Sequence, residues 1–318
     1  MSERGVDDRA VLRGFEPSDI PTGVTHYRGK VREVLTRGDE MVIVATDRVS
    51  AFDRVLGVVP RKGEVLNRIS EFWFRATADV CANHYRRVLT PRSMLVTPCR
   101  VYPVEVVVRG YLTGSAWREY AAGRPVSGVT VPPGMRENQE FSGAIITPST
   151  KENDGDHDRP ISCADIVATG IVPADDWAAI ERSALALFAR GQELARANGL
   201  ILVDTKYEFG HDGEKIVVVD EMHTPDSSRF WYASTYAERF AAGERPDELD
   251  KEYLRRTLME CGYTGDGEPP EIPMTVVSEL SAKYVAAFET ITGEKLSDLS
   301  LDAEAEKKKI LSYVNEGS

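Results

Sequence analysis

Charged side chains alternate along an apolar segment in the second half of the chain, where single residues separate Asp204, Lys206 and Glu208. In a β-strand this spacing places the three side chains on one face. A second apolar run ends at Asp220, and the sequence GHDGE between the two runs is typical of a hairpin turn. Carboxylate oxygens suit Mg²⁺, which also takes water and phosphate oxygens as ligands. The pattern therefore predicts a metal site at Glu208 and Asp220, and the simpler alternative is a solvated hairpin face.

The length of the turn decides whether the two acids share a face, because a slip of one residue moves a side chain to the other face. A two-residue turn at 212–213 pairs Glu208 with Val217 and puts Asp220 on the opposite face. A three-residue turn with a left-handed glycine pairs Glu208 with Ile216 and brings both acids to one face. The metal hypothesis requires the three-residue turn.

Basic and hydroxyl residues stand at the ends of two further segments. Arg109 ends the run VVVR, and Gly114 and Ser115 open a predicted helix shortly after it. A helix N-terminus attracts anions, and Arg109 is near enough in sequence to bind the same anion. In TPDSSRFW, Arg229 can hold an oxyanion through two parallel hydrogen bonds, and Ser227 or Ser228 adds a hydroxyl group. These residues predict anion binding, although a capping serine and structural arginines would explain them equally well.

A basic turn is predicted near the N-terminus, in the sequence YRGKVREV. Gly29 lets backbone N–H groups approach phosphate oxygens, Lys30 adds a positive charge, and Arg32 is nearby. The sequence is not a P-loop, since the chain contains no G-x-x-x-x-G-K-[ST]. Taken alone, an ordinary basic surface turn explains the same residues.

The elements that must position these residues alternate between strands and helices. A hairpin or meander is predicted at 24–46, with further strands at 94–99, 102–112, 200–209 and 215–221. Helices are predicted at 64–80, from Gly114 (capped by Thr113 or Ser115) to Gly123, and at 176–198, 235–242, 247–260, 274–292 and 302–315. Residues 123–175 read as one long connection. The order predicts an α+β fold with two lobes and a cleft.

Composition narrows the classes of function. The chain has 318 residues, of which 42% are hydrophobic, and a net charge of −12. Such a charge disfavours binding to nucleic acid or to an anionic membrane. The apolar runs are of strand length, so no membrane helix is expected, and the N-terminal sequence lacks an apolar signal region. The four scattered cysteines fit a reduced, cytoplasmic protein.

Six segments, in the same order along the chain, resemble one family. They are YRGKVREV, ATDRVSAFD, VVVRGYLTGSAW, TPSTK, DTKYEFG and VVVDE-x-x-TPDSSRFW, which span residues 27 to 232. Together they are similar to the phosphoribosylaminoimidazole-succinocarboxamide synthase (SAICAR synthetase) family. His223 departs from the pattern, because an apolar residue is expected between the acids and TPDSSRFW.

The resemblance implies a two-lobed fold and a reaction. A small β-rich, nucleotide-binding lobe at 1–105 would lie over an ATP-grasp-like lobe at 106–318 that carries C-terminal helices, with ATP in the cleft. ATP and Mg²⁺ would serve to join the carboxylate of carboxyaminoimidazole ribotide (CAIR) to the amine of L-aspartate, giving SAICAR, ADP and phosphate. The small molecules CAIR, L-aspartate and ATP would be its partners, and the enzyme would be a monomer or small homo-oligomer.

The resemblance also implies roles for individual residues. The catalytic residues would be Lys30, Lys206 and Asp220. The ATP contacts would be Gly29, Lys30, Arg32, Lys151 and, beside adenine, Glu105. The metal ligands would be Glu208 and Asp220. The substrate contacts would be Ser50, Asp53, Arg109, Ser115, Asp226, Ser228 and Arg229.

Two other functions compete with this one. A small-molecule kinase of the same architecture would release ADP without L-aspartate. A nucleotide sensor would bind ATP without turnover. Lys30, Glu208, Asp220 and Arg229 occur together in the chain, which argues against the sensor.

Overall fold

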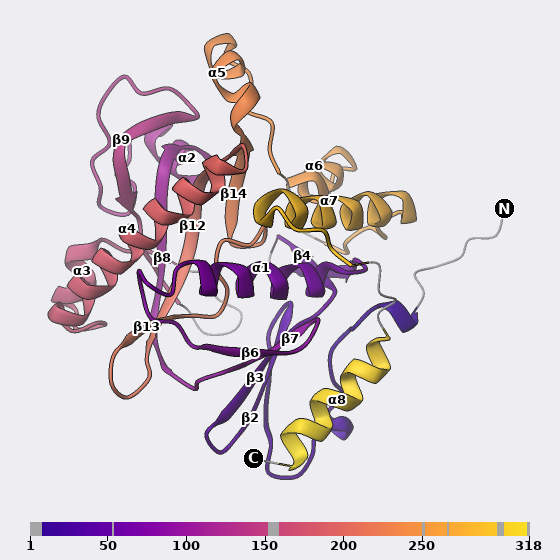
Figure 1. Cartoon of the computed structure of the whole chain (residues 1–318). Helices are drawn as coiled ribbons and strands as arrows, with labels where there is room; N and C mark the ends of the chain where they lie inside the picture. Colours follow the sequence, from indigo (N-terminus) through magenta and orange to yellow (C-terminus); the bar gives the residue numbers. More distant parts are fainter. Residues whose placement is uncertain are drawn as a thin grey trace. The chain divides into compact units, whose positions relative to one another are not determined.

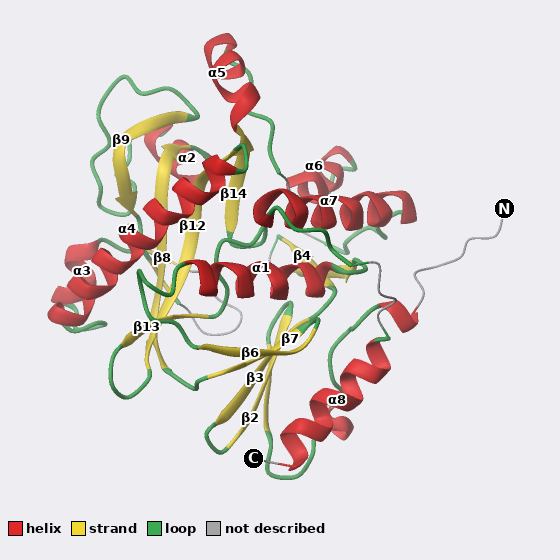
Figure 2. Cartoon of the chain, viewed as in Figure 1, coloured by secondary structure: helices red, strands yellow, loops and turns green. Residues whose placement is uncertain are grey.

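The structure is a computed structural model, and it describes residues 8–52, 54–151, 159–249, 252–265, 267–297 and 302–316. The chain forms two compact units, and each has its own sheet (Figures 1 and 2). The first unit comprises Met1–Phe72, Tyr85–Pro98 and Asp250–Ser318, and the second comprises Trp73–His84 and Cys99–Leu249.

The first unit is built on a five-stranded antiparallel sheet with the order β1-β2-β3-β7-β6. Its strands are β1 (Thr25–Arg28), β2 (Arg32–Arg37), β3 (Glu40–Ala45), β6 (Tyr85–Thr90) and β7 (Ser93–Val96). A separate hairpin joins β4 (Arg48–Ala51) to β5 (Arg54–Val58), and short 3₁₀ turns lie at Asp8–Ala10 and Pro17–Asp19. The meander predicted at 24–46 is confirmed.

Helices complete the first unit. They are α1 (Lys62–Ala76), whose last residues belong to the second unit, α6 (Glu252–Glu260), α7 (Met274–Thr292) and α8 (Ala303–Glu316). In Figure 1, α8 lies along the sheet, and Ile310 and Val314 pack with Leu35 and Val42. The fully buried Arg92 fastens this helix, because it pairs with Glu306 as well as with strand-flanking residues.

The second unit is built on a seven-stranded antiparallel sheet. The order β11-β10-β8-β12-β13 is extended by β9, which pairs with β8, and by β14, which pairs with β12. Its strands are β8 (Arg100–Leu112), β9 (Gln139–Ile146), β10 (Ser149–Thr150), β11 (Arg159–Pro160), β12 (Leu200–His211), β13 (Ile216–Val219) and β14 (Ser228–Tyr232).

One long helix covers one face of this sheet. The helices of the unit are α2 (Gly114–Ala121), α3 (Cys163–Ala168), α4 (Ala174–Ala197) and α5 (Ala233–Ala242). Figure 1 shows α4 running across β8 and β12. Glycines permit the close approach: a Cβ on Gly110 would lie 3.3 Å from Phe188, and one on Gly191 would lie 2.8 Å from Leu202. The opposite face of β8 and β12 carries the charged residues.

Several sequence predictions need correction. The segment 123–175 is not one long connection, because it contains β9, β10, β11 and α3. Its polar composition hid β9, whose burial is irregular. Of the helix predicted at 247–260, residues 247–249 are not helical, and Glu248 forms a bridge to Trp231 instead; the helix is described over Glu252–Glu260. Thr113 occupies the N-cap position of α2, but its hydroxyl donates to Asn138 (2.8 Å).

The α+β class is confirmed. The boundary predicted at residue 105 stays a prediction, and the compact units are divided at other residues. In the part of the chain that the structure describes, every helix is too short or too polar to cross a membrane.

Candidate functional site

A β-bulge turns the charged residues of β12 away from α4. Leu202 and Tyr207 both lie on the side of the sheet that faces α4. Leu202 lies next to Gly191 of that helix, and Tyr207 bonds His223, which also lies next to Gly191. They are five residues apart, an odd number, so strict alternation would put them on opposite faces. The pairing of β12 with β14 shifts between Leu202 and Asp204, and this bulge restores the alternation. A bulge can re-aim a side chain in this way.

Two arginines flank one carboxylate across three neighbouring strands. In register, Asp204 on β12 faces Arg109 on β8 and Arg229 on β14. The same oxygen, Asp204 Oδ2, lies 3.2 Å from Arg109 Nη1 and 3.4 Å from Arg229 Nη2. Arg109 also donates to Thr147 Oγ1 (2.8 Å). Arg109, Arg229 and Asp204 form what we call the arginine cluster, with two positive charges and one negative charge.

The N-terminus of α2 adjoins the arginine cluster. Arg109 Nη2 donates to Ser115 Oγ at 3.1 Å. Gly114 has a φ of 58°, and a Cβ there would lie 2.2 Å from Arg229 Nη1, so only glycine fits. Burial lowers the pKa of Arg109, and the neighbouring Arg229 and Arg118 lower it further, while Asp204 opposes them. The surplus positive charge and the helix N-terminus make this a place for an anion.

A second cluster lies further along the same face of β12. Glu105 on β8 is the register partner of Glu208, and Lys206 reaches both carboxylates. Lys206 Nζ is 3.5 Å from Glu208 and closer to Glu105. Lys151 Nζ binds the other oxygen of Glu208. Like charges directly opposite each other on a sheet are destabilising, and the two lysines relieve that repulsion.

Asp220 acts electrostatically on this second cluster. Burial alone would lower the pKa of Lys206, but the carboxylates of Glu105, Glu208 and Asp220 outweigh it and raise that pKa. Asp220 follows the last residue of β13 and has a φ of 68°. The left-handed conformation breaks the strand alternation at this residue. Glu105, Lys151, Lys206, Glu208 and Asp220 form what we call the lysine–carboxylate cluster.

Both registers predicted for the hairpin are wrong. Glu208 pairs with Val219, and His211 pairs with Ile216, so four residues form the turn. Asp212 organises this longer turn, because its carboxylate accepts from the backbone N–H groups of Glu214 and Lys215 (both 2.9 Å). Asp220 nevertheless helps to raise the pKa of Lys206, although neither predicted register is present. The metal role predicted for Glu208 and Asp220 stays a prediction.

The carboxylates of this cluster suit some metals and not others. Among the described residues, no three His, Cys, Asp or Glu side chains are arranged as a metal-binding group. Zinc and similar ions need such a set, but Mg²⁺ is commonly bound by one or two carboxylates plus substrate phosphates. Glu208 and Asp220 fit that pattern, because their cluster has three carboxylates against two ammonium groups.

The turn between Asp220 and Arg229 is held by hydroxyl groups. Thr224 is fully buried, and its hydroxyl donates to Glu221 Oε2 (2.6 Å) and accepts from the backbone N–H of Asp226 (3.2 Å). Ser228 Oγ shares a hydrogen bond with Thr205 Oγ1 (2.7 Å), so this predicted substrate contact is engaged inside the protein. Asp226 is half-buried.

His223 belongs to the core beneath this turn. It is fully buried, its φ is 48°, and its Nε2 bonds the hydroxyl of Tyr207. Its ring packs edge-on against Trp73, with 4.6 Å between centroids. Burial lowers the pKa of His223 to about 3, so it is neutral at ordinary pH. The chain therefore accommodates a histidine at an apolar position without adding a charge.

The remaining predicted residues belong to the first unit. Gly29 opens the β1–β2 turn, and its N–H donates to the carbonyl of Arg32 (2.9 Å). Lys30 is exposed and Arg32 is half-buried. Ser50 is half-buried on β4, and Asp53 lies outside the described residues. The roles predicted for these residues stay predictions.

The structure adds residues to the site that sequence reasoning left without a role. Asp204 was placed on the charged face, but its position between two arginines follows from the pairing of β8, β12 and β14. Thr147, which accepts from Arg109, lies in the segment predicted as one long connection. A signal for Asp204 was present in its alternation with Lys206 and Glu208; none distinguished Thr147.

Comparison with known proteins identifies the family. The SAICAR synthetase sequence family matches residues 25–271. Phosphoribosylaminoimidazole-succinocarboxamide synthase of Legionella pneumophila (strain Lens) is 47% identical over 284 residues, which cover 87% of this chain and 90% of the relative. The enzyme of the same name from Bacteroides fragilis (strain YCH46) is 47% identical over 305 residues, which cover 93% and 96%.

Solved structures agree. SAICAR-synthase from Saccharomyces cerevisiae, complexed with SAICAR, matches with a TM-score of 0.78 and 34% identity, over 90% of this chain and 99% of that one. A SAICAR synthetase in complex with ADP matches with a TM-score of 0.67 and 26% identity, over 86% and 100%. The chain belongs to the SAICAR synthetase family, the ATP-dependent carbon–nitrogen ligases of purine biosynthesis that join CAIR to L-aspartate.

Proposed function

We propose that the chain performs the ligation of its family with the two clusters in separate roles. The arginine cluster binds the phosphate of CAIR, and the lysine–carboxylate cluster serves the phosphates of ATP and their Mg²⁺. The observation that carries this division is the arrangement across β8, β12 and β14, where one carboxylate lies between two arginines.

The reaction needs activation of a carboxylate. The CAIR carboxylate is a poor electrophile, because direct attack would expel oxide. Transfer of the γ-phosphoryl group from ATP gives an acyl phosphate and ADP. The amine of L-aspartate then attacks the acyl carbon, the C–O bond to phosphate breaks, and the amine loses a proton as the amide forms. Such chemistry depends mainly on positioning and on electrostatic stabilisation.

The arginine cluster suits a phosphate monoester. Planar guanidinium groups match phosphate oxygens with paired hydrogen bonds. Arg109 and Arg229 approach from two strands, and Ser115 adds a hydroxyl at the start of α2. Asp204 keeps the two arginines together when the anion is absent, and its single charge leaves the cluster positive. Ser228 supports this wall of the site through Thr205.

The lysine–carboxylate cluster suits a metal–nucleotide complex. Glu208 and Asp220 would hold Mg²⁺, which neutralises charge on the transferred phosphoryl group. Lys206 stays protonated because carboxylates surround it, so it acts as a fixed positive charge and not as a base. Lys151 is partly exposed, with 40% of its side chain accessible, and is free to move from Glu208 to a phosphate.

We also propose roles for residues of the first unit, and a compartment and an oligomeric state for the enzyme. Gly29, Lys30 and Arg32 would contact ATP phosphates, Ser50 and Asp53 would contact substrate, and Glu105 would also adjoin the adenine. Asp226 would accept from a substrate hydroxyl or amine. A cytoplasmic enzyme that is a monomer or small homo-oligomer, without nucleic-acid or membrane partners, completes the proposal.

The experiment is to measure ADP release with ATP, Mg²⁺ and CAIR, with and without L-aspartate, and to record the product mass. Release that requires aspartate, with a product heavier than CAIR by aspartate less water, is expected. Release indifferent to aspartate would indicate phosphoryl transfer alone. ATP binding without turnover would contradict the proposal.

A further inference from the structure

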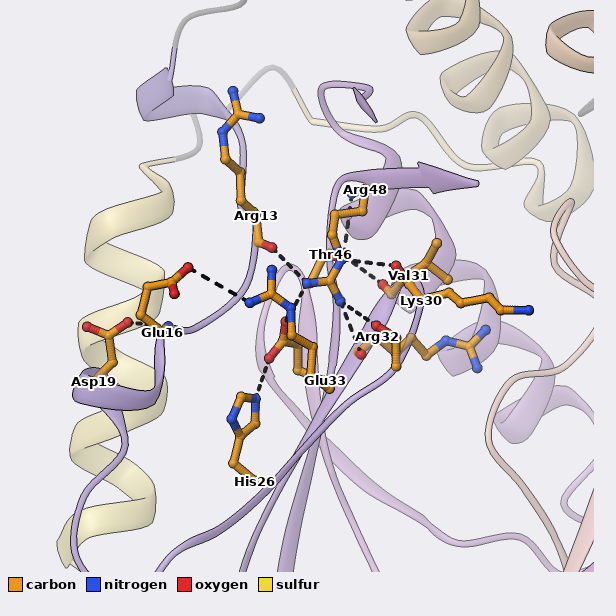
Figure 3. A network of polar contacts seen from close by, with 12 residues as sticks. Arg13, Glu16, Asp19, His26, Lys30, Val31, Arg32, Glu33, Thr46 and Arg48 are labelled. Atoms are coloured by element: carbon orange, nitrogen blue, oxygen red, sulfur yellow. Dashed lines mark hydrogen bonds and ion pairs between the residues drawn. The ribbon is translucent and has the colours of Figure 1, made fainter. Parts of the chain in front are cut away.

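One buried arginine of the first unit uses its whole hydrogen-bonding capacity. A guanidinium group has five N–H donors. Arg48, at the start of β4, directs Nε to the carbonyl of Lys30 (3.1 Å) and Nη2 to the carbonyls of Gly29 (2.9 Å) and Arg32 (3.3 Å). Nη1 donates to the carbonyl of Arg13 (2.9 Å) and to Glu33. Figure 3 shows these contacts converging on Arg48.

The acceptors of Arg48 are concentrated in the β1–β2 turn. Three of the four carbonyls in residues 29–32 accept from its side chain. The fourth, that of Val31, accepts from the hydroxyl (2.7 Å) and the backbone N–H (3.0 Å) of Thr46. Every carbonyl of the turn is therefore held by the segment Thr46–Arg48. Both Thr46 and Arg48 are buried.

This anchoring orients the other side of the turn. In a planar trans peptide the N–H points opposite to the carbonyl. Because the carbonyls of Gly29, Lys30 and Val31 point to the 46–48 segment, the N–H bonds of the same peptides point away from it. The side chains of Lys30 and Arg32 also extend away from Arg48 (Figure 3). Successive N–H groups on one side of a turn, next to basic side chains, form an anion-binding concavity.

A second layer holds Arg48 itself. Glu33 is fully buried and binds Arg48 Nη1 and His26 Nε2. Gly14 packs directly over this pair: its φ is 113°, and a Cβ there would lie 2.0 Å from Glu33 Oε1. The site is thus built around the Arg48–Glu33 pair and has no room for a different arrangement.

We infer that Arg48 is a positioning residue for a nucleotide phosphate site made by the Gly29–Arg32 turn. It contacts no phosphate itself; it fixes the carbonyl side of the turn so that the N–H side and Lys30 meet the anion. The inference rests on the proposed function in that the phosphate is taken to be that of ATP. A lysine cannot replace Arg48, because an ammonium group has three donors and no planar fork.

The test compares binding of ATP and of adenosine to wild-type protein and to Arg48→Lys, with Arg37→Lys as the matched control. Arg37 ends β2, the strand that begins at Arg32 of the turn. It also donates to backbone carbonyls, those of Val314 (3.1 Å) and Asn315, but at the end of the strand far from the turn. For Arg48→Lys the ATP dissociation constant should rise about tenfold or more, and that of adenosine less than about twofold. Arg37→Lys should change neither.

A structural role alone would weaken ATP and adenosine by the same factor, and that result would overturn the inference, as would unchanged ATP binding. Thr46→Val is the milder variant, should Arg48→Lys fail to fold. It removes one hydrogen bond to the Val31 carbonyl, and a selective loss of ATP affinity, smaller than the loss expected for Arg48→Lys, is expected. An equal change for both ligands would again contradict the inference.

Chemical rescue of ATP affinity gives a further test of the positioning role, because a loss of protein stability alone would not produce it. Arg48→Ala should regain part of its ATP affinity in methylguanidinium but not in methylammonium, because only the former supplies the planar fork. Rescue by both cations equally, or by neither, would count against the positioning role. Failure of the proposed function is separate: wild-type protein would bind ATP more tightly than adenosine yet show no aspartate-dependent ADP release.

Discussion

The two clusters on the charged face of β12 differ in sign, although four residues, about 13 Å of strand, separate their centres at Asp204 and Glu208. The arginine cluster has two guanidinium groups and one carboxylate. The lysine–carboxylate cluster has three carboxylates and two ammonium groups. One strand therefore presents a net positive site and a net negative site on the same face.

Under the proposed roles, the difference would let one sheet separate two phosphate-bearing ligands. A positive cluster of arginines takes a phosphate directly. A negative cluster needs a cation before it can take one, so it suits a nucleotide that arrives with Mg²⁺. Each cluster carries a net charge of one, positive in one case and negative in the other, so the loss of one charged residue changes that net charge by its full size.

The largest effect is expected from Asp220→Asn. Asparagine tolerates the left-handed conformation of this residue, so the turn is retained while the charge is lost. Loss of a metal carboxylate should lower turnover by about 100-fold or more. Steady-state rates at increasing Mg²⁺ concentrations measure it, and excess Mg²⁺ should recover part of the loss.

Asp212→Asn is the control for that test, because Asp212 lies on the same hairpin but in its exposed turn. It should keep its turnover. Near-normal activity of Asp220→Asn at low Mg²⁺ would remove Asp220 from the metal site.

The next largest effect is expected at the arginine cluster. Arg229→Ala removes one of the two guanidinium groups and should weaken CAIR binding by about 10- to 100-fold, because a charge-assisted pair of hydrogen bonds is lost. ATP binding should be unchanged. Calorimetric titrations with each ligand separate the two, and Arg124→Ala, an exposed arginine just after α2, is the control. Equal loss for both ligands would refute the assignment.

Asp204→Asn should affect stability more than turnover. Without the carboxylate, Arg109 and Arg229 repel each other, and the free energy of unfolding should fall by about 3 kcal/mol, as for other broken buried pairs. Phosphate should restore much of that loss, since it takes the place of the carboxylate. Thermal unfolding with and without phosphate measures this; equal stabilisation of wild type and variant by phosphate would contradict it.

The smallest effect at neutral pH is expected from His223→Phe, in the segment that joins the two clusters. The pKa of His223 is about 3 in the folded protein, against 6.5 ordinarily. Below pH 6.5 the histidine therefore binds a proton in the unfolded chain but stays neutral in the folded protein. This histidine should cost about 1.4 kcal/mol of stability per pH unit as the pH falls from 6.5 toward 3.

Above pH 6.5 the histidine contributes no slope. Denaturant unfolding across this range should show a flatter pH dependence for His223→Phe. An identical slope in wild type and variant would show that His223 does not carry the effect.

Much of the fold could be predicted from periodicity. The helix α7 begins and ends where apolar spacing places it, and Asp204, Lys206 and Glu208 share a face because side chains alternate along a strand. The hairpin register could not be predicted, because the length of the turn depended on Asp212 binding two backbone N–H groups. The left-handed conformation of Asp220 could not be predicted either, because no glycine signals it.

Neighbours distant in sequence explain what else was missed. Asp204 stands between Arg109 and Arg229 only because β8, β12 and β14 adjoin, and strand order is a property of the whole sheet. Arg48 received no role from the sequence, and its five acceptors, on Arg13 and on residues 29–33, meet it only in the folded unit. Single-residue patterns do not reveal such partners.

The most direct measurement is a crystal structure with Mn²⁺, ADP and CAIR, in which anomalous scattering locates the metal. We expect manganese bound by Glu208 and Asp220, and the CAIR phosphate bound by Arg109 and Arg229. Manganese elsewhere, or the ADP phosphates on the two arginines, would contradict the division of roles between the clusters.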